Sequence, residues 1–129
     1  MNNPVTETRT TKIWLDENGI IRILTKPGIT RQTLSDAVEN MEAVEVVRSG
    51  KRRPVFVDLQ NAVSTDVEGR RYYSRPELAD RFTACAFIIG SPISRVIGSF
   101  FLGLNKLPFP VRLFTSDESA LEWLKNILE

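Results

Sequence analysis

The sequence predicts a single α/β domain with a mixed, mostly parallel β-sheet that begins with an antiparallel hairpin and carries helices packed on the sheet. Two short strand-like segments come first and are separated by turn residues. Three more short apolar segments follow, and segments with helical periodicity lie between them. Because crossovers between parallel strands are right-handed, the connecting helices are expected to cover the sheet.

The first two strands are expected at residues 11–15 and 20–25. The turn between them, Asp16-Glu17-Asn18-Gly19, supplies residues that tolerate positive φ, as a tight hairpin requires. Residues 54–59 and 83–89 are short apolar runs typical of strands covered on both faces, and the first of them is expected to be central. Residues 111–114 form the last predicted strand.

The first helix is expected to be capped by Thr30 and to end before Gly50. Its apolar residues recur at helical spacing: Leu34, Val38, Met41 and Val44.

Two short helices are predicted next. Thr65 and Glu68 have the spacing of a capping box, and Ser74 and Glu77 repeat it, with Pro76 in the first turn. A further helix is predicted from 90–92 to about residue 106, and Ser116 is expected to cap the last one.

Composition argues against a polyanionic partner. The chain has 129 residues, a formal net charge of +1 and 42% hydrophobic residues, enough for one continuous core. No long-range field favours nucleic acid or an anionic membrane, so neither partner is expected. The basic runs 51–53 and 70–71 lack accompanying aromatic residues for base stacking and are interpreted as solvated turns and helix faces.

Residues 1–10 are interpreted as a loose tail and residues 11–129 as one domain. The polar start lacks a secretory signal, and no apolar run approaches the ~20 residues of a bilayer span, so a cytoplasmic protein without membrane insertion is expected. Cys85 is the single cysteine and lies in an apolar run, where a thiol usually behaves as a small buried hydrophobe.

No catalytic centre is evident. Histidine is absent, which removes the commonest general base near neutral pH and the commonest metal ligand. Phosphate-binding and dinucleotide-binding glycine motifs are absent as well. We therefore expect no enzymatic activity and no cofactor; a carboxylate-based hydrolase would need an acid and base pair that the sequence does not reveal.

The order of elements and the segment Val55-Phe56-Val57-Asp58-Leu59 resemble the STAS domain, the SpoIIAA-like superfamily typified by anti-sigma-factor antagonists. In that family an Asp-Ser-Ser-Gly-like motif at a helix start follows such a strand. The corresponding segment here is Asp66-Val67-Glu68-Gly69. The second half also resembles a bacterial STAS/Sec14-like group without assigned function, through residues 90–95 and 100–106.

This resemblance implies a non-enzymatic protein-interaction module whose partner surface includes Asp66, Glu68 and Gly69. In the family, phosphorylation of the motif serine controls the contact. Glu68 stands at that position and at best imitates a permanently modified state, since a carboxylate carries less charge and fewer acceptor oxygens than a phosphate.

Two groups of polar side chains are candidate ligand sites, and each also has an ordinary structural explanation. Asp58, Asp66 and Glu68 could converge on Mg²⁺, but carboxylates near helix starts are common for capping alone, so no metal is expected. At the next predicted helix start, Ser91, Ser94 and Arg95 could bind an anion; Ser91 could equally be a simple cap and Arg95 a partner for a surface carboxylate.

The predicted helix at 93–106 has little polar face, because it includes Phe100, Phe101 and several aliphatic residues; Phe109 follows it. It could be internal, form a homo-oligomer interface or border an apolar pocket, and the interface is favoured. The leading hypothesis is thus a self-associating interaction module. The alternative is a carrier of a small apolar or anionic ligand that uses residues 90–109, with Ser91, Ser94 and Arg95 at the polar end and Phe101 or Phe109 at the apolar end.

Overall fold

The strands of the sheet lie side by side in the order in which they occur in the chain. The structure is a computed structural model that describes residues 4–29, 31–61, 64–90 and 107–127. Within these ranges the sheet order is β1-β2-β3-β4-β5-β6. The strands are β1 (Thr6–Glu7), β2 (Thr11–Leu15), β3 (Ile21–Thr25), β4 (Arg53–Asp58), β5 (Phe82–Ile88) and β6 (Val111–Phe114).

The β1–β2 and β2–β3 pairings are antiparallel, and the pairings from β3 to β6 are parallel. The predicted mixed, mostly parallel sheet with an N-terminal hairpin is therefore confirmed. At the hairpin turn, Gly19 adopts a φ of 78°, and the carboxylate of Asp16 accepts hydrogen bonds from the backbone N–H groups of Asn18 and Ile20 at 2.9 and 3.0 Å.

Helix α1 (Leu34–Val47) begins with a cap different from the one predicted. Thr33, not Thr30, is the N-cap: its hydroxyl accepts from the N–H of Asp36 at 3.3 Å, and the Asp36 carboxylate accepts from the N–H of Thr33 at 2.8 Å. Residue 30 lies outside the described residues. This reciprocal pair is a capping box that uses Asp at the third helical position, where Glu or Gln is usual.

The predicted apolar spacing in α1 mixes two faces of the helix. Met41 and Val44 are buried, whereas Leu34 is 38% exposed and Val38 only partly buried. The other buried residues of the helix are Asp36, Ala37, Asn40 and Ala43. The helix ends near the expected place, with positive φ at Ser49 and Gly50.

Two short helices follow β4, as predicted: α2 (Val67–Tyr73) and the 3₁₀ helix η1 (Pro76–Asp80). Both predicted caps are wrong. Thr65 is paired with Gln32 in a β-bridge, so it stays extended and Asp66 becomes the N-cap of α2. Ser74 ends α2, where its hydroxyl donates to the carbonyl of Arg70 at 3.0 Å, and Arg75 precedes η1.

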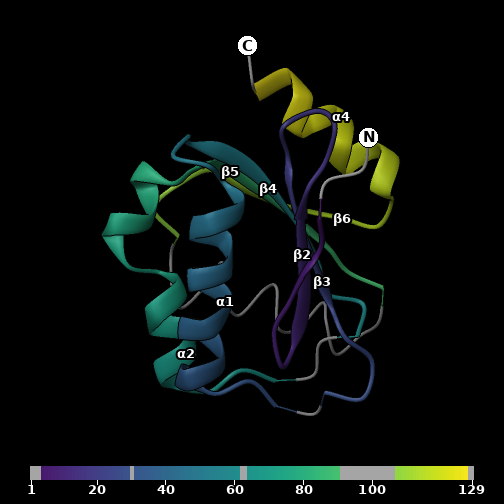
Figure 1. Ribbon diagram of the computed structural model, residues 1–129. Helices are drawn as coiled ribbons and strands as arrows, with labels where there is room; N and C mark the ends of the chain where they lie inside the picture. Colours follow the sequence, from purple (N-terminus) through teal and green to yellow (C-terminus); the bar gives the residue numbers. More distant parts are fainter. Residues whose placement is uncertain (1–3, 30, 62–63, 91–106, 128–129) are drawn as a thin grey trace.

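Helices cover both faces of the sheet. Helices α1, α2 and η1 lie over one face, and α4 (Asp117–Ile127) lies over the other (Figure 1). Successive residues of the central strands point to opposite faces. Val55 and Cys85 contribute to the core beneath α1, whereas Phe56 and Ala86 pack beneath α4. The Ser116 hydroxyl accepts from the N–H of Ser119 at 3.3 Å, which confirms it as the α4 cap.

Residues 6–10 are not the loose tail that composition predicts. Thr6 and Glu7 form β1, which pairs with Ile13 and Lys12 of β2. Thr8 and Thr10 are buried because their hydroxyls bond to the Asn40 side chain on α1. The predicted helix at 93–106 lies outside the described residues.

The packing of α4 predicts a large effect of truncating Leu124, which is 0% exposed. Leu124→Ala should lower the free energy of unfolding by about 2–5 kcal/mol, since it leaves a cavity against the sheet. The matched control is Val46→Ala on α1, which is 76% exposed and should change stability by about 0.5 kcal/mol or less. If urea unfolding showed equal losses in the free energy of unfolding for the two variants, this packing of α4 would be contradicted.

Candidate functional site

The residues predicted as a partner surface lie together at the start of α2. Asp66 is the N-cap, Val67 is 51% exposed and Glu68 is exposed, whereas Gly69 is buried. The first three residues are thus accessible to a partner, and the fourth is part of the packing beneath them.

An arginine that was not predicted to belong to this surface holds the segment in place. Arg31, in the loop before α1, forms a bidentate ion pair with Asp66, with Nε–Oδ1 and Nη2–Oδ2 distances of 2.7 and 2.9 Å. The hydrogen bond from Arg31 and its positive charge hold the pKa of Asp66 below its ordinary value. Arg31 and Asp66 are far apart in sequence, so no local motif signals the pair.

Backbone bonds reinforce the link between the two loops. The Gln32 N–H donates to the carbonyl of Ser64, and the Asp66 N–H donates to the carbonyl of Gln32, both at 2.9 Å. Gly69 lets the helices approach: a Cβ there would lie 3.0 Å from Thr65 Cγ2 and 3.5 Å from the carbonyl oxygen of Thr33. The motif glycine is therefore explained by close packing between α2 and the start of α1.

The N-terminal segment also contacts the start of α1. Arg9 Nε and Nη2 donate to the two carboxylate oxygens of Asp36, both at 2.6 Å, and Nη2 donates to the carbonyl of Arg31 at 2.9 Å. The hydrogen bond from Arg9, together with those from Thr33, lowers the pKa of Asp36 to about 2. Arg9 thus contacts the α1 capping box and the backbone of the residue that binds Asp66.

Asn40 is the centre of a buried polar network. Its Oδ1 accepts from the hydroxyls of Thr8 and Thr11 at 2.6 and 2.9 Å. Its Nδ2 donates to the hydroxyl of Tyr73 on α2 at 3.1 Å, and that hydroxyl donates to Gln32 Oε1 at 3.1 Å. Burial raises the pKa of Tyr73 to about 12, so the phenol remains protonated near neutral pH.

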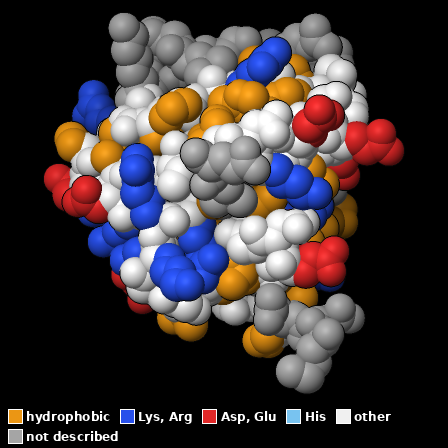
Figure 2. All heavy atoms as spheres, turned by 90° about the horizontal axis from the view of Figure 1, so that it is seen from above, with side chains coloured by type: hydrophobic (Ala, Val, Ile, Leu, Met, Phe, Trp, Pro, Cys, Tyr) orange, Lys and Arg blue, Asp and Glu red, His pale blue; other side chains and the backbone are white. Residues whose placement is uncertain are grey.

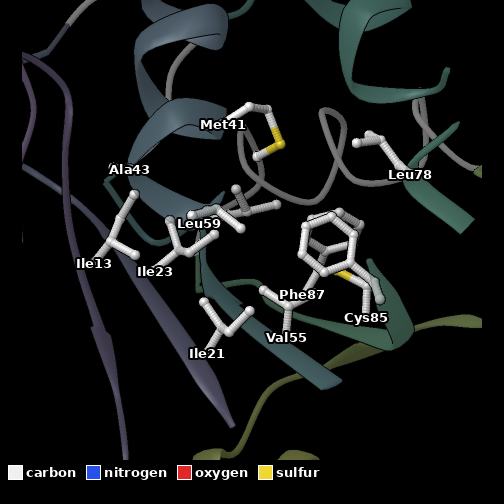
Figure 3. Packing of buried hydrophobic residues seen from close by; sticks show 12 residues of the cluster. Ile13, Ile21, Ile23, Met41, Ala43, Val55, Leu59, Leu78, Cys85 and Phe87 are labelled. Atoms are coloured by element: carbon white, nitrogen blue, oxygen red, sulfur yellow. The ribbon is translucent and has the colours of Figure 1, made fainter. Parts of the chain in front are cut away.

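An apolar cavity of about 100 Å³ lies next to this network, between the sheet and the helices. In Figure 3, Met41 of α1 and Leu78 of η1 face Phe87 across this part of the core. The lining residues are Thr11, Ile23, Thr25, Gln32, Asn40, Met41, Val55, Val57, Leu59, Tyr73, Leu78, Phe82, Cys85, Phe87, Leu107 and Phe109. At about 24 cal/mol per Å³, an empty cavity of this volume costs roughly 2 kcal/mol of stability.

Phe109 is the one residue of the predicted ligand set that the structure describes; Ser91, Ser94, Arg95 and Phe101 lie outside the described residues. Phe109 packs edge-to-face on Phe82, with ring centroids 5.4 Å apart, and lines the cavity. Cys85 lines it too. Burial raises the pKa of that thiol, which makes it a poor nucleophile.

The three carboxylates considered for Mg²⁺ have separate surroundings. Asp58 Oδ1 accepts from the N–H of Gln60 at 2.9 Å, Asp66 binds Arg31, and Glu68 is exposed. Within the described ranges, no group of three Asp, Glu, Cys or His side chains is placed to hold a metal ion. Asp58 and Asp66 therefore have structural partners.

Basic side chains gather on one side of the end of the domain where α1 stops, with acidic side chains among them (Figure 2). Arg53 Nε donates to the carbonyl of Arg48 at 2.8 Å, and Arg52 Nε donates to that of Ala79 at 2.9 Å. These bonds give the run at 51–53 a structural role in closing loops. In the described part of the chain, no helix is long and apolar enough to cross a membrane.

Comparison with solved structures identifies the class of fold. An uncharacterised protein of the DUF3478 family with a SpoIIAA-like fold, from Shewanella loihica PV-4, matches 95% of this chain and 91% of its own length, with a TM-score of 0.57 and 14% identity. The chain is thus an α/β domain with a SpoIIAA-like fold, as the sequence resemblance implied.

The particular family is one without an assigned function. Residues 13–128 match the family described as Domain of unknown function (DUF7793), and the chain belongs to it. A protein of unknown function from Arthrobacter sp. FB24 is 32% identical over 92% of this chain and 95% of its own, with a TM-score of 0.35. No curated protein matches the sequence.

The Arg9–Asp36 pair predicts a pH dependence of stability. Because the pKa of Asp36 is about 2 in the folded chain and 3.8 ordinarily, its contribution is present above about pH 4 and is lost as the pH falls towards 2. Urea unfolding between about pH 6 and about pH 2 should show a shallower decline in the free energy of unfolding for Asp36→Asn than for the wild type. Equal declines would show that Asp36 is not the linked group.

Proposed function

We propose that this chain is a non-enzymatic interaction module that binds another protein through the start of α2. One observation supports this most strongly: the Arg31–Asp66 ion pair fixes the helix start while Val67 and Glu68 remain exposed. A fixed backbone that presents one aliphatic and one charged side chain lowers the entropy cost of binding. Leu34, the first residue of α1, is a further exposed aliphatic side chain, with 38% of its surface accessible.

The chemistry of the described side chains supports a binding role over catalysis. Asp66 is engaged by Arg31, and the buried groups Tyr73 and Cys85 remain protonated near neutral pH. None of these groups is poised to act as a base or nucleophile. A reduced, buried cysteine also fits the cytoplasm, where we place the protein.

Glu68 gives the contact surface a permanent negative charge. It stands where the STAS resemblance implies a phosphoacceptor serine, and it carries no hydroxyl to modify. We therefore propose that binding at this surface is not switched by phosphorylation of residue 68. The partner is expected to place a basic side chain against Glu68 and an apolar one against Val67.

Reversing the charge of Glu68 tests this surface. Glu68→Lys should reduce recovery of the specific partner about tenfold, since a close like-charge contact replaces an attractive one. The matched control is Glu77→Lys, the same change at an exposed position of η1. Cross-linking in cells followed by quantitative mass spectrometry compares wild type and both variants.

The result has a clear contrary outcome. If Glu68→Lys remains folded by circular dichroism and recovers every partner that Glu77→Lys recovers, the start of α2 is not the contact surface.

We also propose that the chain self-associates. The sequence supports this, because the segment 93–106 carries Phe100, Phe101 and several aliphatic residues with little polar face at helical spacing, and an apolar face of that kind favours contact between copies. Light scattering on the eluate of a size-exclusion column should give at least twice the 14.6 kDa mass of one chain. A mass of one chain at all loading concentrations would overturn this proposal.

A second candidate function is carriage of a small ligand. It is favoured by the apolar cavity, which Phe109 lines together with residues of α1, α2 and four strands. This cavity places the candidate ligand beneath the helices, on the opposite side of the sheet from α4.

A further inference from the structure

We infer that the cavity beneath α1 and α2 binds a small, uncharged, nonpolar molecule, no larger than about one six-membered ring. This inference rests on the second candidate function and goes further by selecting the chemical class of the ligand. A carrier of this fold could in principle take an apolar or an anionic molecule. The size, charge and hydrogen bonding of the cavity distinguish the two classes.

The cavity walls are apolar on most sides. Ile23 and Val55 form the floor on the sheet, Met41 lies above them, and Phe82 and Phe109 close one end with their rings packed edge-to-face. None of the described lining residues carries a charge at neutral pH. An anion enclosed there would lose its hydration without gaining a counter-charge, which is strongly unfavourable.

Asn40 and Tyr73, which line the cavity, are already engaged in hydrogen bonds. Asn40 Oδ1 already accepts from the hydroxyls of Thr8 and Thr11, and Asn40 Nδ2 donates to Tyr73. Tyr73 in turn donates to Gln32 Oε1. A ligand hydroxyl that approached Asn40 or Tyr73 would compete with these bonds, so this part of the cavity favours a hydrocarbon over its hydroxylated analogue.

The volume limits the size of the ligand. Pockets for drug-sized molecules span about 300–1,000 Å³, whereas a dry protein cavity of roughly 150 Å³ holds benzene. At about 100 Å³ this cavity accommodates a compact ring with slight relaxation of its walls, or a short alkyl chain. The ligand could be a free hydrocarbon or the end of a longer alkyl chain, since both have this chemistry. They differ because the rest of the longer chain would have to lie outside the cavity.

Methionine methyl NMR provides a direct test, since the chain has only two methionines, Met1 and Met41. Met41 lines the cavity, and Met1 serves as an internal control. In full-length protein with isotope-labelled methionine methyl groups, benzene should shift the Met41 resonance saturably. Phenol should bind about tenfold more weakly. Hexane and octane added in parallel distinguish a short alkyl chain from a longer one.

Two variants connect the signal with the cavity. Cys85→Leu adds bulk to the wall and should weaken benzene binding about tenfold. Val57→Ile, a smaller change on the same wall, should weaken it in the same direction and serves if Cys85→Leu does not fold. Ile88→Val is the control in the core beneath α4 and should leave benzene binding unchanged.

The possible results distinguish failure of the proposed ligand class from failure of ligand carriage itself. If benzene binds but phenol binds as tightly, the ligand class is wrong and carriage of a small ligand stands. If benzene, hexane and octane all leave the Met41 resonance unchanged, both the inference and the second candidate function are overturned. Neither outcome affects the α2 contact surface, which Glu68→Lys tests separately.

Discussion

The link between the loops that precede α1 and α2 determines the arrangement of the whole candidate surface. Arg31 neutralises Asp66 through two hydrogen bonds, and Gln32 pairs its backbone with residues on either side of Thr65. A bidentate guanidinium–carboxylate pair fixes direction as well as distance. Without it, the orientation of Val67 and Glu68 would depend on a helix of only seven residues, too short to be stable alone.

Asn40 performs the corresponding role on the buried side of α1. An amide that is buried must have its donors and acceptor satisfied, and here the partners come from the N-terminal segment and from α2. The network therefore fixes the positions of the N-terminal segment, α1 and α2 relative to one another, which nondirectional hydrophobic contacts do less specifically. It also uses up the polar groups beside the cavity, so one set of hydrogen bonds contributes to the stability of the fold and to the apolar character of the space next to it.

Local signals predicted much of the fold. The Asp16-to-Gly19 turn, the apolar strands and the Ser116 cap depend on residues close in sequence, and each is present as expected. The caps of α1 and α2 were mispredicted because the Gln32–Thr65 bridge keeps Thr65 extended and the Thr33–Asp36 pair starts α1 later. The bridge depends on how the chain returns after β4, which periodicity does not encode, whereas the α1 cap is a local capping box with Asp in place of the usual Glu or Gln.

The candidate site was predicted in part. The motif at 66–69 located the start of α2, but neither Arg31 nor Arg9 has a sequence pattern that points to a carboxylate so far along the chain. The threonines at 8 and 10 suggested a tail because hydroxyls are usually solvated, and they are buried only because Asn40 satisfies them. Pairing between polar side chains far apart in the chain was therefore the main feature of the site that could not be predicted from the sequence.

The sequential order of the strands has a consequence for how the chain acquires its structure. Among the strands that the structure describes, each one after β1 pairs with the strand before it, so none of them is inserted between two already paired. Loop closure is then limited to one connection at a time, which keeps its entropy cost small. During synthesis, each new strand can join an edge that already exists, and the sheet can grow in the direction in which the ribosome releases the chain.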